Sequence, residues 1–470
     1  MSEENKLQNK LTLSPVTLTL YMLGGMFPAG FVLVITGYYF MFFMTDILLL
    51  PTALAATVYS AIQWWKLLSM VASGMIIDGI PLKSGRYRGW SLIAGIVQAI
   101  AFPLAFADLG LPPVAAAIGV FVFEAILMLA YNVAWTALRT LPAKMAKTSQ
   151  DINWLNVMSN VGGSLPALIW GTLSGALLSI PLWANTSNQY FGVCCIFSIF
   201  FIMAGIIMFK MAAPYDTPAD ALKSKKDSGA AQKQQGAGLK AIFKSLRGPM
   251  IPYFISGVLN SAQAGFFQTL LTYYTAYVLG NPALAASIVT LQSVIGLIGS
   301  FVVPTMTKRV TKKGSMVFAQ TFNAVSYILL AIFGTNAAVF VGLRCLMTAV
   351  GCIPNVTSYG IPLDIGDYFE MKGETSQRAI LTSVGGTTVR LGFAASTTIS
   401  AFALAAIGYQ AGAPFTAEMG TKLTLLIAVG PAIFAAISAI LMQFFYKVDE
   451  RAIDAYRLER AAKAAKAENQ

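Results

Sequence analysis

The chain has 470 residues, of which 56% are hydrophobic and 11% are charged, and its net charge is +12. A soluble globular domain carries about 25% charged residues, so this composition excludes a protein whose whole surface faces water. The four cysteines lie inside apolar segments without metal-ligand spacing, and the chain has no histidine. We therefore expect no metal site, no cofactor and no catalytic residues.

Residues 1–14 are polar and of mixed charge, unlike a signal peptide, so we expect a cytoplasmic N-terminus ahead of a first segment that is retained. Twelve apolar segments then recur, each long enough for the roughly 20 residues of a spanning helix. The first and eleventh are long enough to imply a tilt or a kink. This pattern predicts an all-α, multi-pass membrane protein. The segments cover approximately 15–44, 51–77, 89–108, 112–138, 153–181, 190–213, 249–279, 283–307, 315–334, 337–360, 378–408 and 421–446.

A polar stretch divides the chain into two sets of six segments. The sequence "TPADALKSKKDSGAAQKQQGAGLK" after the sixth segment has the composition of a flexible linker. The basic loops "GMIIDGIPLKSGRYRG" and "TMTKRVTKKGS" follow the second segment of each set, which is a weak internal repeat. Paired six-helix halves with a site between them are typical of transporters, here of the major facilitator fold. We predict an N-terminal six-helix bundle at 15–213, a cytoplasmic linker at 214–248, a C-terminal six-helix bundle at 249–447 and a cytoplasmic tail at 448–470.

The positive charge is concentrated in alternate loops. Lysines and arginines lie in the loops near 83–88, 139–147, 223–247, 308–313 and 372–378 and in the tail, whereas the opposite loops hold only Lys422. This positive-inside pattern places both termini in the cytoplasm of a cell that carries the protein in its plasma (inner) membrane. Anionic lipid headgroups are sufficient partners for the charge, so we expect no nucleic acid, and we expect a monomer.

Four stretches resemble landmarks of a known family. They are "YYFMFFMTDILLL" at 38–50, "YYTAYVLGN" at 273–281, "DIGDYFEMKGETSQR" at 364–378 and "AIGYQAG" at 406–412. They are similar to segments of the glycoside–pentoside–hexuronide:cation symporters, of which the melibiose carrier is the best-known member, although Phe369 stands where that family has a small residue. The resemblance covers essentially the whole chain and implies a major facilitator fold and secondary transport of sugars or glycosides with Na⁺, H⁺ or Li⁺.

The acidic residues that the family uses for coupling are absent. Aligned with the family, the two cation-binding aspartates of the second segment fall at Lys66 and Met70, and the aspartate of the fourth falls at Trp135. The acid of the first segment falls near Gly30, and the lysine of the eleventh is matched by Arg390. Because Na⁺ needs oxygen ligands and an ammonium group repels it, Na⁺ coupling of the family type is not expected.

Polar side chains recur at helical spacing on four segments. Lipid cannot satisfy such groups, so they face a cavity or the bundle interior, or they hydrogen-bond a neighbouring helix. The stripes are Tyr59, Gln63, Lys66, Met70 and Ser73; Glu124, Met128, Tyr131, Trp135 and Arg139; Asn153, Asn156 and Asn160; and Ser383, Thr387, Arg390 and Thr397. The substrate-binding residues predicted from them are Lys66, Arg390, Trp135, Tyr131, Gln63, Tyr59, Asn156, Asn160 and Thr387.

The charges within the segments favour an anionic solute. Lys66, Arg344 and Arg390 are cationic, whereas only Glu124 is clearly acidic, so a carboxylate, sulfonate or sulfate group would balance the surplus. A guanidinium at Arg390 would bind such a group with two parallel hydrogen bonds. Trp135, with Tyr131, Trp64 and Trp65, could stack on a sugar ring.

Lys66 has two interpretations. It could be a tethered substitute for the coupling ion, or it could simply pair with Glu124 and stiffen the first half; Glu124 could also pair with Arg344 or carry protons. We further predict gating by ion pairs that form between helices at the cytoplasmic face in the outward-open state. The gating candidates are Asp78, Arg86, Asp364, Asp367 and Glu370.

Two other functions fit the sequence. A lipid or lysolipid transporter with the same fold would need a lateral opening between helices. A sensor without transport activity would use the Ala-, Lys- and Glu-rich tail "KVDERAIDAYRLERAAKAAKAENQ" to recruit a partner, although a solvated helix with an i,i+4 pair of Glu459 and Lys463 also explains it.

Overall fold

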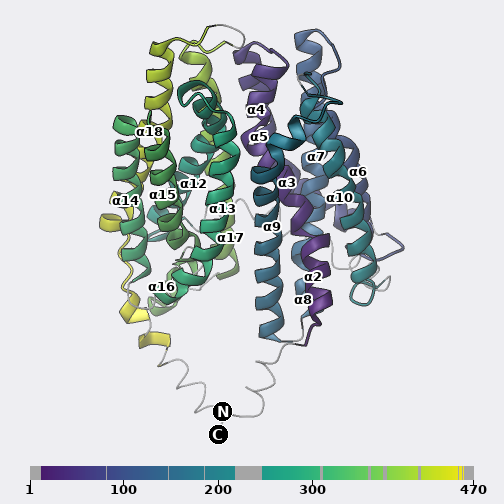
Figure 1. The fold of residues 1–470 in the computed structure, drawn as a ribbon. Coiled ribbons are helices and arrows are strands. Elements are labelled where there is room, and N and C mark those ends of the chain that lie inside the picture. Colours follow the sequence, from purple (N-terminus) through teal and green to yellow (C-terminus); the bar gives the residue numbers. More distant parts are fainter. Residues whose placement is uncertain are drawn as a thin grey trace. The chain divides into compact units, whose positions relative to one another are not determined.

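The computed structural model describes residues 12–80, 82–146, 148–184, 186–217, 246–306, 311–357, 361–373, 378–410, 414–453, 455–457 and 459. Over these residues the regular structure is helical, apart from one isolated bridge between Leu82 and Gly85 (Figure 1). The first predicted span consists of α2 (Pro15–Gly24), α3 (Met26–Tyr38), α4 (Phe40–Phe42) and η1 (Phe43–Ile47). The next five spans correspond to α5 (Thr52–Gly79), α6 (Arg88–Ala105), α7 (Pro113–Thr140), α9 (Ser149–Leu178) and α10 (Gln189–Met211).

The second six spans correspond to a matching series of helices. They are α12 (Met250–Tyr273) with η2 (Tyr274–Val278); α13 (Ala283–Met306); α14 (Lys312–Phe333); α15 (Ala337–Thr357); α17 (Arg378–Ala406); and α18 (Ala417–Ile440) with η3 (Leu441–Phe445). Eight of the described helices are long and apolar enough to cross a membrane. The prediction of an all-α membrane protein is therefore confirmed.

Two short helices lie in segments where the sequence predicted connections. These are α8 (Pro142–Met145) and α16 (Ile361–Met371). α16 contains the start of the "DIGDYFEMKGETSQR" stretch and buries Ile361, Ile365 and Phe369 against a hydrophobic cluster. The apolar residues recur every three or four positions, which is the period of a helix with one buried face.

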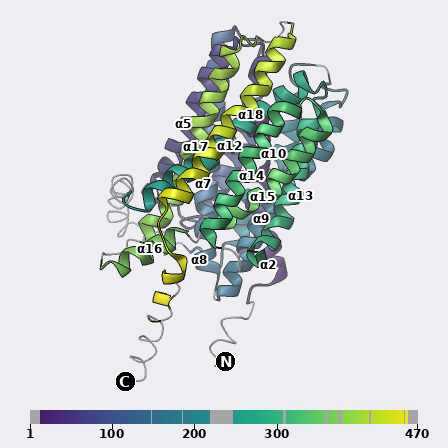
Figure 2. The ribbon, with the colours of Figure 1, turned by 90° about the vertical axis from the view of Figure 1, so that its left-hand side faces the viewer.

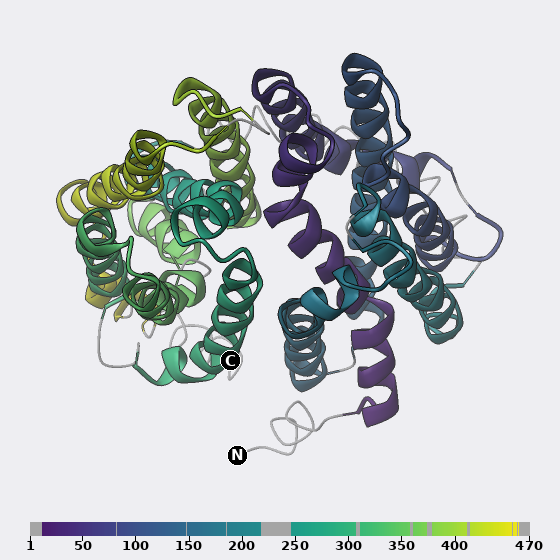
Figure 3. The ribbon, with the colours of Figure 1, turned by 45° about the horizontal axis from the view of Figure 1, so that its top comes forward.

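The first span is broken, as its length implied. Gly25 separates α2 from α3 with φ −111° and ψ −91°, and the last turn of the span, η1, is π-helical. The bend is visible in the purple helix of Figure 3. A Cβ atom at Gly25 would collide with Leu138 of α7, so glycine permits this close helix contact at the break. The eleventh span, α17, is one continuous helix.

The chain separates into two compact units. The first comprises Met1–Gln235, Gln268–Leu297 and Thr397–Leu423, and the second comprises Gly236–Phe267, Ile298–Ser396 and Thr424–Gln470, in both cases as far as these ranges are described. In the first unit α6 packs against α7 and α10, α5 packs along α7, and α3 packs along α9 (Figure 1). The division into two six-helix bundles remains a prediction.

A carboxylate beyond the last helix of each half holds the start of the third helix. In the first unit the buried Asp216 accepts hydrogen bonds from the backbone N–H groups of Arg86, Tyr87 and Arg88, the last two at 2.6 and 2.9 Å. In the second unit Glu450 accepts from the N–H groups of Lys312 and Lys313, both at 2.8 Å. The first N–H groups of a helix have no partner within it, so both carboxylates satisfy donors at a helix start.

Candidate functional site

The centre of the candidate site is a pair of opposite charges on α5 and α7. Lys66 Nζ lies 4.0 Å from Glu124 Oε1, and the side chain of Glu124 is fully buried while that of Lys66 is 25% exposed. Neither carboxylate oxygen of Glu124 has a hydrogen-bond partner among the described residues. A buried carboxylate normally has such partners, so the ammonium group of Lys66 is the main feature that compensates this charge.

Side-chain hydrogen bonds to backbone oxygens fix how α5 lies on α7. Asn132 Nδ2 donates to Ser69 Oγ at 2.8 Å and to the backbone oxygen of Lys66 at 3.3 Å. Trp65 Nε1 donates to the backbone oxygen of Ala125 at 2.9 Å, directly next to Glu124. These bonds flank the ion pair, so they hold Lys66 and Glu124 opposite each other.

The other predicted residues of α5 are engaged in packing. Tyr59 is 1% exposed and makes side-chain hydrogen bonds with Gln63 and with Thr269 of α12. Gln63 is 8% exposed. Both lie within two turns of Lys66 on one face, so they border the ion pair without being open to solvent.

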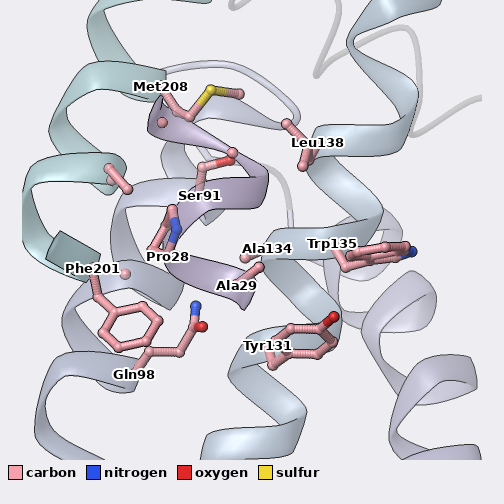
Figure 4. Close-up of a pocket in the computed structure, with 15 residues that line it drawn as sticks. Pro28, Ala29, Ser91, Gln98, Tyr131, Ala134, Trp135, Leu138, Phe201 and Met208 are labelled. Atoms are coloured by element: carbon pink, nitrogen blue, oxygen red, sulfur yellow. The ribbon is translucent and has the colours of Figure 1, made fainter. Parts of the chain in front are cut away.

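Two predicted aromatic residues lie on the next turns of α7. The rings of Tyr131 and Trp135 are stacked with centroids 5.9 Å apart, and the guanidinium carbon of Arg139 lies 4.6 Å from the Trp135 ring centroid. Both rings border a cavity of about 30 Å³ beside Pro28 and Ala29 of α3 (Figure 4). This volume holds one water molecule and is far smaller than the ligand pockets of about 300 Å³ and more that enclose small molecules.

The remaining predicted substrate residues lie on α9 and α17. Asn156 and Asn160 are exposed on α9 of the first unit, while the side chains of Asn153 and Ser383 lie outside the described residues. Thr387 and Arg390 are partly buried on α17, in a part of the chain assigned to the second unit. Their convergence with Lys66 stays a prediction.

The gating candidates form ion pairs within each unit. Asp78, at the end of α5, pairs with Arg86 of the following loop at 2.5 Å. Burial alone lowers the pKa of Arg86, but its hydrogen bond to Asp78 and the charge of that carboxylate outweigh this and raise the pKa. The role of this pair as a gate in the outward-open state remains a prediction.

The acidic residues of α16 bind basic residues of the second unit. Asp364 accepts hydrogen bonds from Lys312 of α14 at 2.6 Å and from Arg457 at 2.9 Å, and Asp367 pairs with the same arginine. Figure 2 shows α16 beside the lower end of α18 and the segment that follows it. Glu370 lies on the same helix. The structure thus connects these predicted gating residues to the C-terminal segment, a contact that was not expected.

Arg344 has neighbours other than the predicted Glu124. Its guanidinium carbon lies 3.3 Å from the ring centroid of Phe267, and it donates to Tyr327 Oη at 3.4 Å, all within the second unit. Within the first unit Glu124 pairs with Lys66. Of the two partners considered for Glu124, the structure therefore shows Lys66.

A second, partly buried polar cluster was not predicted from the sequence, although its residues lie in the quoted landmarks. Asp46, in "YYFMFFMTDILLL", accepts hydrogen bonds from Tyr277 of "YYTAYVLGN" and, at 2.5 Å, from Tyr409 of "AIGYQAG". Thr45 donates to Asp46 Oδ2 at 2.6 Å and is 2.6 Å from Tyr273 Oη. We call these five residues the Asp46 cluster. The sequence signal that could have indicated the cluster is the position of Asp46, Tyr277 and Tyr409, each near the same end of a different span.

Residues 21–450 match the model of a family described as MFS/sugar transport protein. An isoprimeverose transporter of Lactiplantibacillus pentosus is 24% identical over 88% of this chain and 84% of its own length. A protein of Escherichia coli (strain K12) named "Putative sulfoquinovose importer" is 24% identical over 96% of this chain and 94% of its own length. The resemblance to sugar:cation symporters drawn from the four landmark stretches is therefore confirmed.

The fold is similar to that of solved transporter structures. The nucleoside transporter NupG aligns with a TM-score of 0.63 and 15% identity, over 92% of this chain and 99% of that one. At this identity the likeness concerns the fold alone. It supports the major facilitator fold that the two sets of six segments predicted.

Proposed function

Because the chain belongs to the MFS/sugar transport protein family, it is a multi-pass membrane transporter with a small-molecule substrate, and we propose that it moves a sugar, a glycoside or a related anion. The proposed mechanism is alternating access, in which a site between the two halves opens to one side of the membrane at a time. Transport is secondary and is driven by the gradient of the solute, with or without protons carried by Glu124.

The proposed orientation follows from the charge of the loops. Lys83, Arg86, Lys312 and Lys313 lie at one end of the spans, and this end is cytoplasmic in the plasma membrane together with both termini. The Asp46 cluster then lies at the opposite, outer end. Anionic lipid headgroups contact the basic loops, and the functional unit is a monomer.

The observation that supports this function most directly is the ion pair of Lys66 with Glu124. By the resemblance, Lys66 stands where related symporters carry an aspartate for the coupling cation. Its ammonium group lies 4.0 Å from Glu124, the one carboxylate of α7 (Pro113–Thr140). A bound Na⁺ in relatives supplies one positive charge to buried oxygens, and here a covalently attached ammonium supplies it. The site is therefore complete without Na⁺, and Na⁺ is not a co-substrate.

An anionic solute is the proposed substrate class. Lys66 and Glu124 balance each other's charge, and the guanidinium of Arg390 would bind a sulfonate or carboxylate with two parallel hydrogen bonds. Two relatives are consistent with a sugar-sized solute, one named for isoprimeverose and one for the sulfosugar sulfoquinovose. The stacked pair of Tyr131 and Trp135 offers a flat surface for a sugar ring.

A binding screen tests the substrate class. We expect sulfoquinovose or glucuronate, but not glucose, to raise the melting temperature of the purified protein and to be taken up by proteoliposomes. Arg390→Lys should weaken the binding of the anion about tenfold, because an ammonium cannot form the bidentate contact. Lys422→Gln is the matched control, since Lys422 is an exposed cation paired with Glu418. Equal binding of glucose, or equal anion binding by both variants, would contradict the anionic class.

A further inference from the structure

The Asp46 cluster consists of a carboxylate held by hydroxyl groups. Tyr277 and Tyr409 donate to one oxygen of Asp46, and Thr45 donates to the other. Among the described residues no lysine or arginine forms an ion pair with Asp46. Hydrogen bonds to an ionised acceptor are about twice as strong as neutral ones, so the two tyrosines are firmly bound, yet water can replace each of them.

The groups of the cluster come from distant parts of the sequence. Asp46 ends the first span, Tyr277 lies in η2 at the end of the seventh span, and Tyr409 lies in the loop before the last span, all within the first compact unit. Two further bonds join the same segments: Thr52 donates to the backbone oxygen of Tyr409 at 2.6 Å, and Thr272 donates to that of Tyr38 at 2.7 Å. The cluster therefore ties spans of the first half of the sequence to spans of the second.

Two close helix contacts accompany the cluster and depend on glycine. A Cβ atom at Gly37 of α3 would overlap the amide of Gln268 on α12, and one at Gly171 of α9 would overlap Thr290 of α13. Thr290 Oγ1 also donates to the backbone oxygen of Ala167 at 3.3 Å. Small residues let helix backbones approach in a membrane, so this contact surface is packed as closely as the chain permits.

We propose that the Asp46 cluster is the latch that closes the outer end of the transport path. Opening this end would separate η2 and the loop with Tyr409 from η1 and would break the bonds of Tyr277 and Tyr409 to Asp46. The inference rests on the alternating access proposed above, which requires contacts at each end to form and break in turn. A carboxylate–tyrosine contact suits this role because water satisfies both partners once they part.

A buried reporter measures the opening without any substrate. Ala286 on α13 is 5% exposed and lies next to the Gly171 contact. A cysteine at Ala286, in a chain whose four native cysteines are alanine, should react slowly with a membrane-impermeant maleimide added outside. Tyr277→Phe combined with Tyr409→Phe keeps the ring packing but removes both donors. We expect this double variant to react at least about tenfold faster, since losing even one hydrogen bond to a charged group produces a change of this size.

Two further variants separate the latch from general packing. Tyr21→Phe removes a buried tyrosine hydroxyl that donates to Leu138, remote from the cluster, and should leave the labelling rate unchanged. Asp46→Ala should match the double tyrosine variant, and combining the two should add little, because they remove the same bonds. Equal labelling of the parent, the double variant and Asp46→Ala, all with unchanged melting temperatures, would overturn the latch. Labelling that responds as expected in a protein that takes up no sugar would contradict the proposed substrate and leave the latch standing.

Discussion

At the scale of single residues, a charge inside the membrane needs a specific partner. A charged side chain at the centre of a spanning helix costs about 3 kcal/mol even on the mildest insertion scale. The stretch 61–78 carries such a charge at Lys66, and the buried carboxylate of Glu124 lies 4.0 Å from its ammonium group. Neither charge is compensated without the other, because removing one partner leaves the other unpaired inside the protein.

Removing Lys66 should therefore harm both folding and transport. We expect Lys66→Ala to lower the free energy of unfolding by about 2–4 kcal/mol, near the lower part of the range for broken buried pairs, since Lys66 is 25% exposed. Lys66→Met combined with Glu124→Gln should regain the stability, because it leaves no buried charge. The comparison is made by thermal unfolding in detergent and by uptake into proteoliposomes.

The variant that combines Lys66→Met with Glu124→Gln distinguishes the two roles of Lys66. A tethered cation that holds the site ready predicts a stable but inactive double variant. If stability and uptake are both restored, Lys66 only stiffens the first half of the protein.

Asp216 binds the backbone N–H groups at the start of α6, and this contact gives a second prediction for a single residue. It accepts three backbone hydrogen bonds from residues 86–88 and pairs with Lys144 at 3.1 Å. Asp216→Ala should lower the free energy of unfolding by about 2–4 kcal/mol, since buried N–H donors would lose their acceptor. Thermal unfolding measures this loss, with Asp108→Ala in the connection between α6 and α7 as the control. An equal loss in both variants would contradict the role of Asp216.

At the scale of elements, the sequence predicts the spans well and the contacts between them poorly. Apolar length alone places α5, α7 and α10 correctly, because lipid requires a helix of about 20 apolar residues. The break at Gly25 was implied by the length of the first span, but not its position. α16 was missed because a connection and a short amphipathic helix have similar compositions.

Contacts between distant segments depend on packing that no local pattern encodes. The bond from Tyr409 to Asp46 spans 363 residues and that from Tyr277 spans 231 residues. Taken alone, each of these residues is a polar group near the end of a span, and its partner cannot be predicted. For the same reason the sequence left two partners open for Glu124, namely Lys66 and Arg344. In the structure Arg344 contacts Phe267 and Tyr327 instead.

The link of α16 to the C-terminal segment gives the prediction at this scale. Asp364 pairs with both Lys312 and Arg457, so Asp364→Asn should loosen the contact of α16 with α14 and the C-terminal segment. We expect slower transport, with the affinity for substrate on the outer side changed by no more than a few-fold, because α16 lies away from Lys66 in the sequence of spans. Uptake rates and binding measured in parallel check this. Unchanged turnover would count against a gating role, and Glu418→Gln, which removes an exposed carboxylate, serves as the control.

At the scale of the whole molecule, the family scaffold is retained, whereas we propose that the coupling chemistry is changed. Residues 21–450 match the sugar transport family, and the landmarks of that family meet in the Asp46 cluster. The position of a coupling aspartate, in contrast, holds Lys66. We therefore propose that the scaffold provides alternating access and that the ion pair forms a site that needs no Na⁺.

Uptake by proteoliposomes in which Na⁺ is replaced by choline tests this central claim most directly. With sulfoquinovose or glucuronate as the solute, we expect the rate for the unmodified protein to be the same in Na⁺, K⁺ and choline, and the rate for Lys66→Ala to fall to that of empty liposomes. A strong requirement for Na⁺ in the unmodified protein, or full activity of Lys66→Ala, would contradict the account.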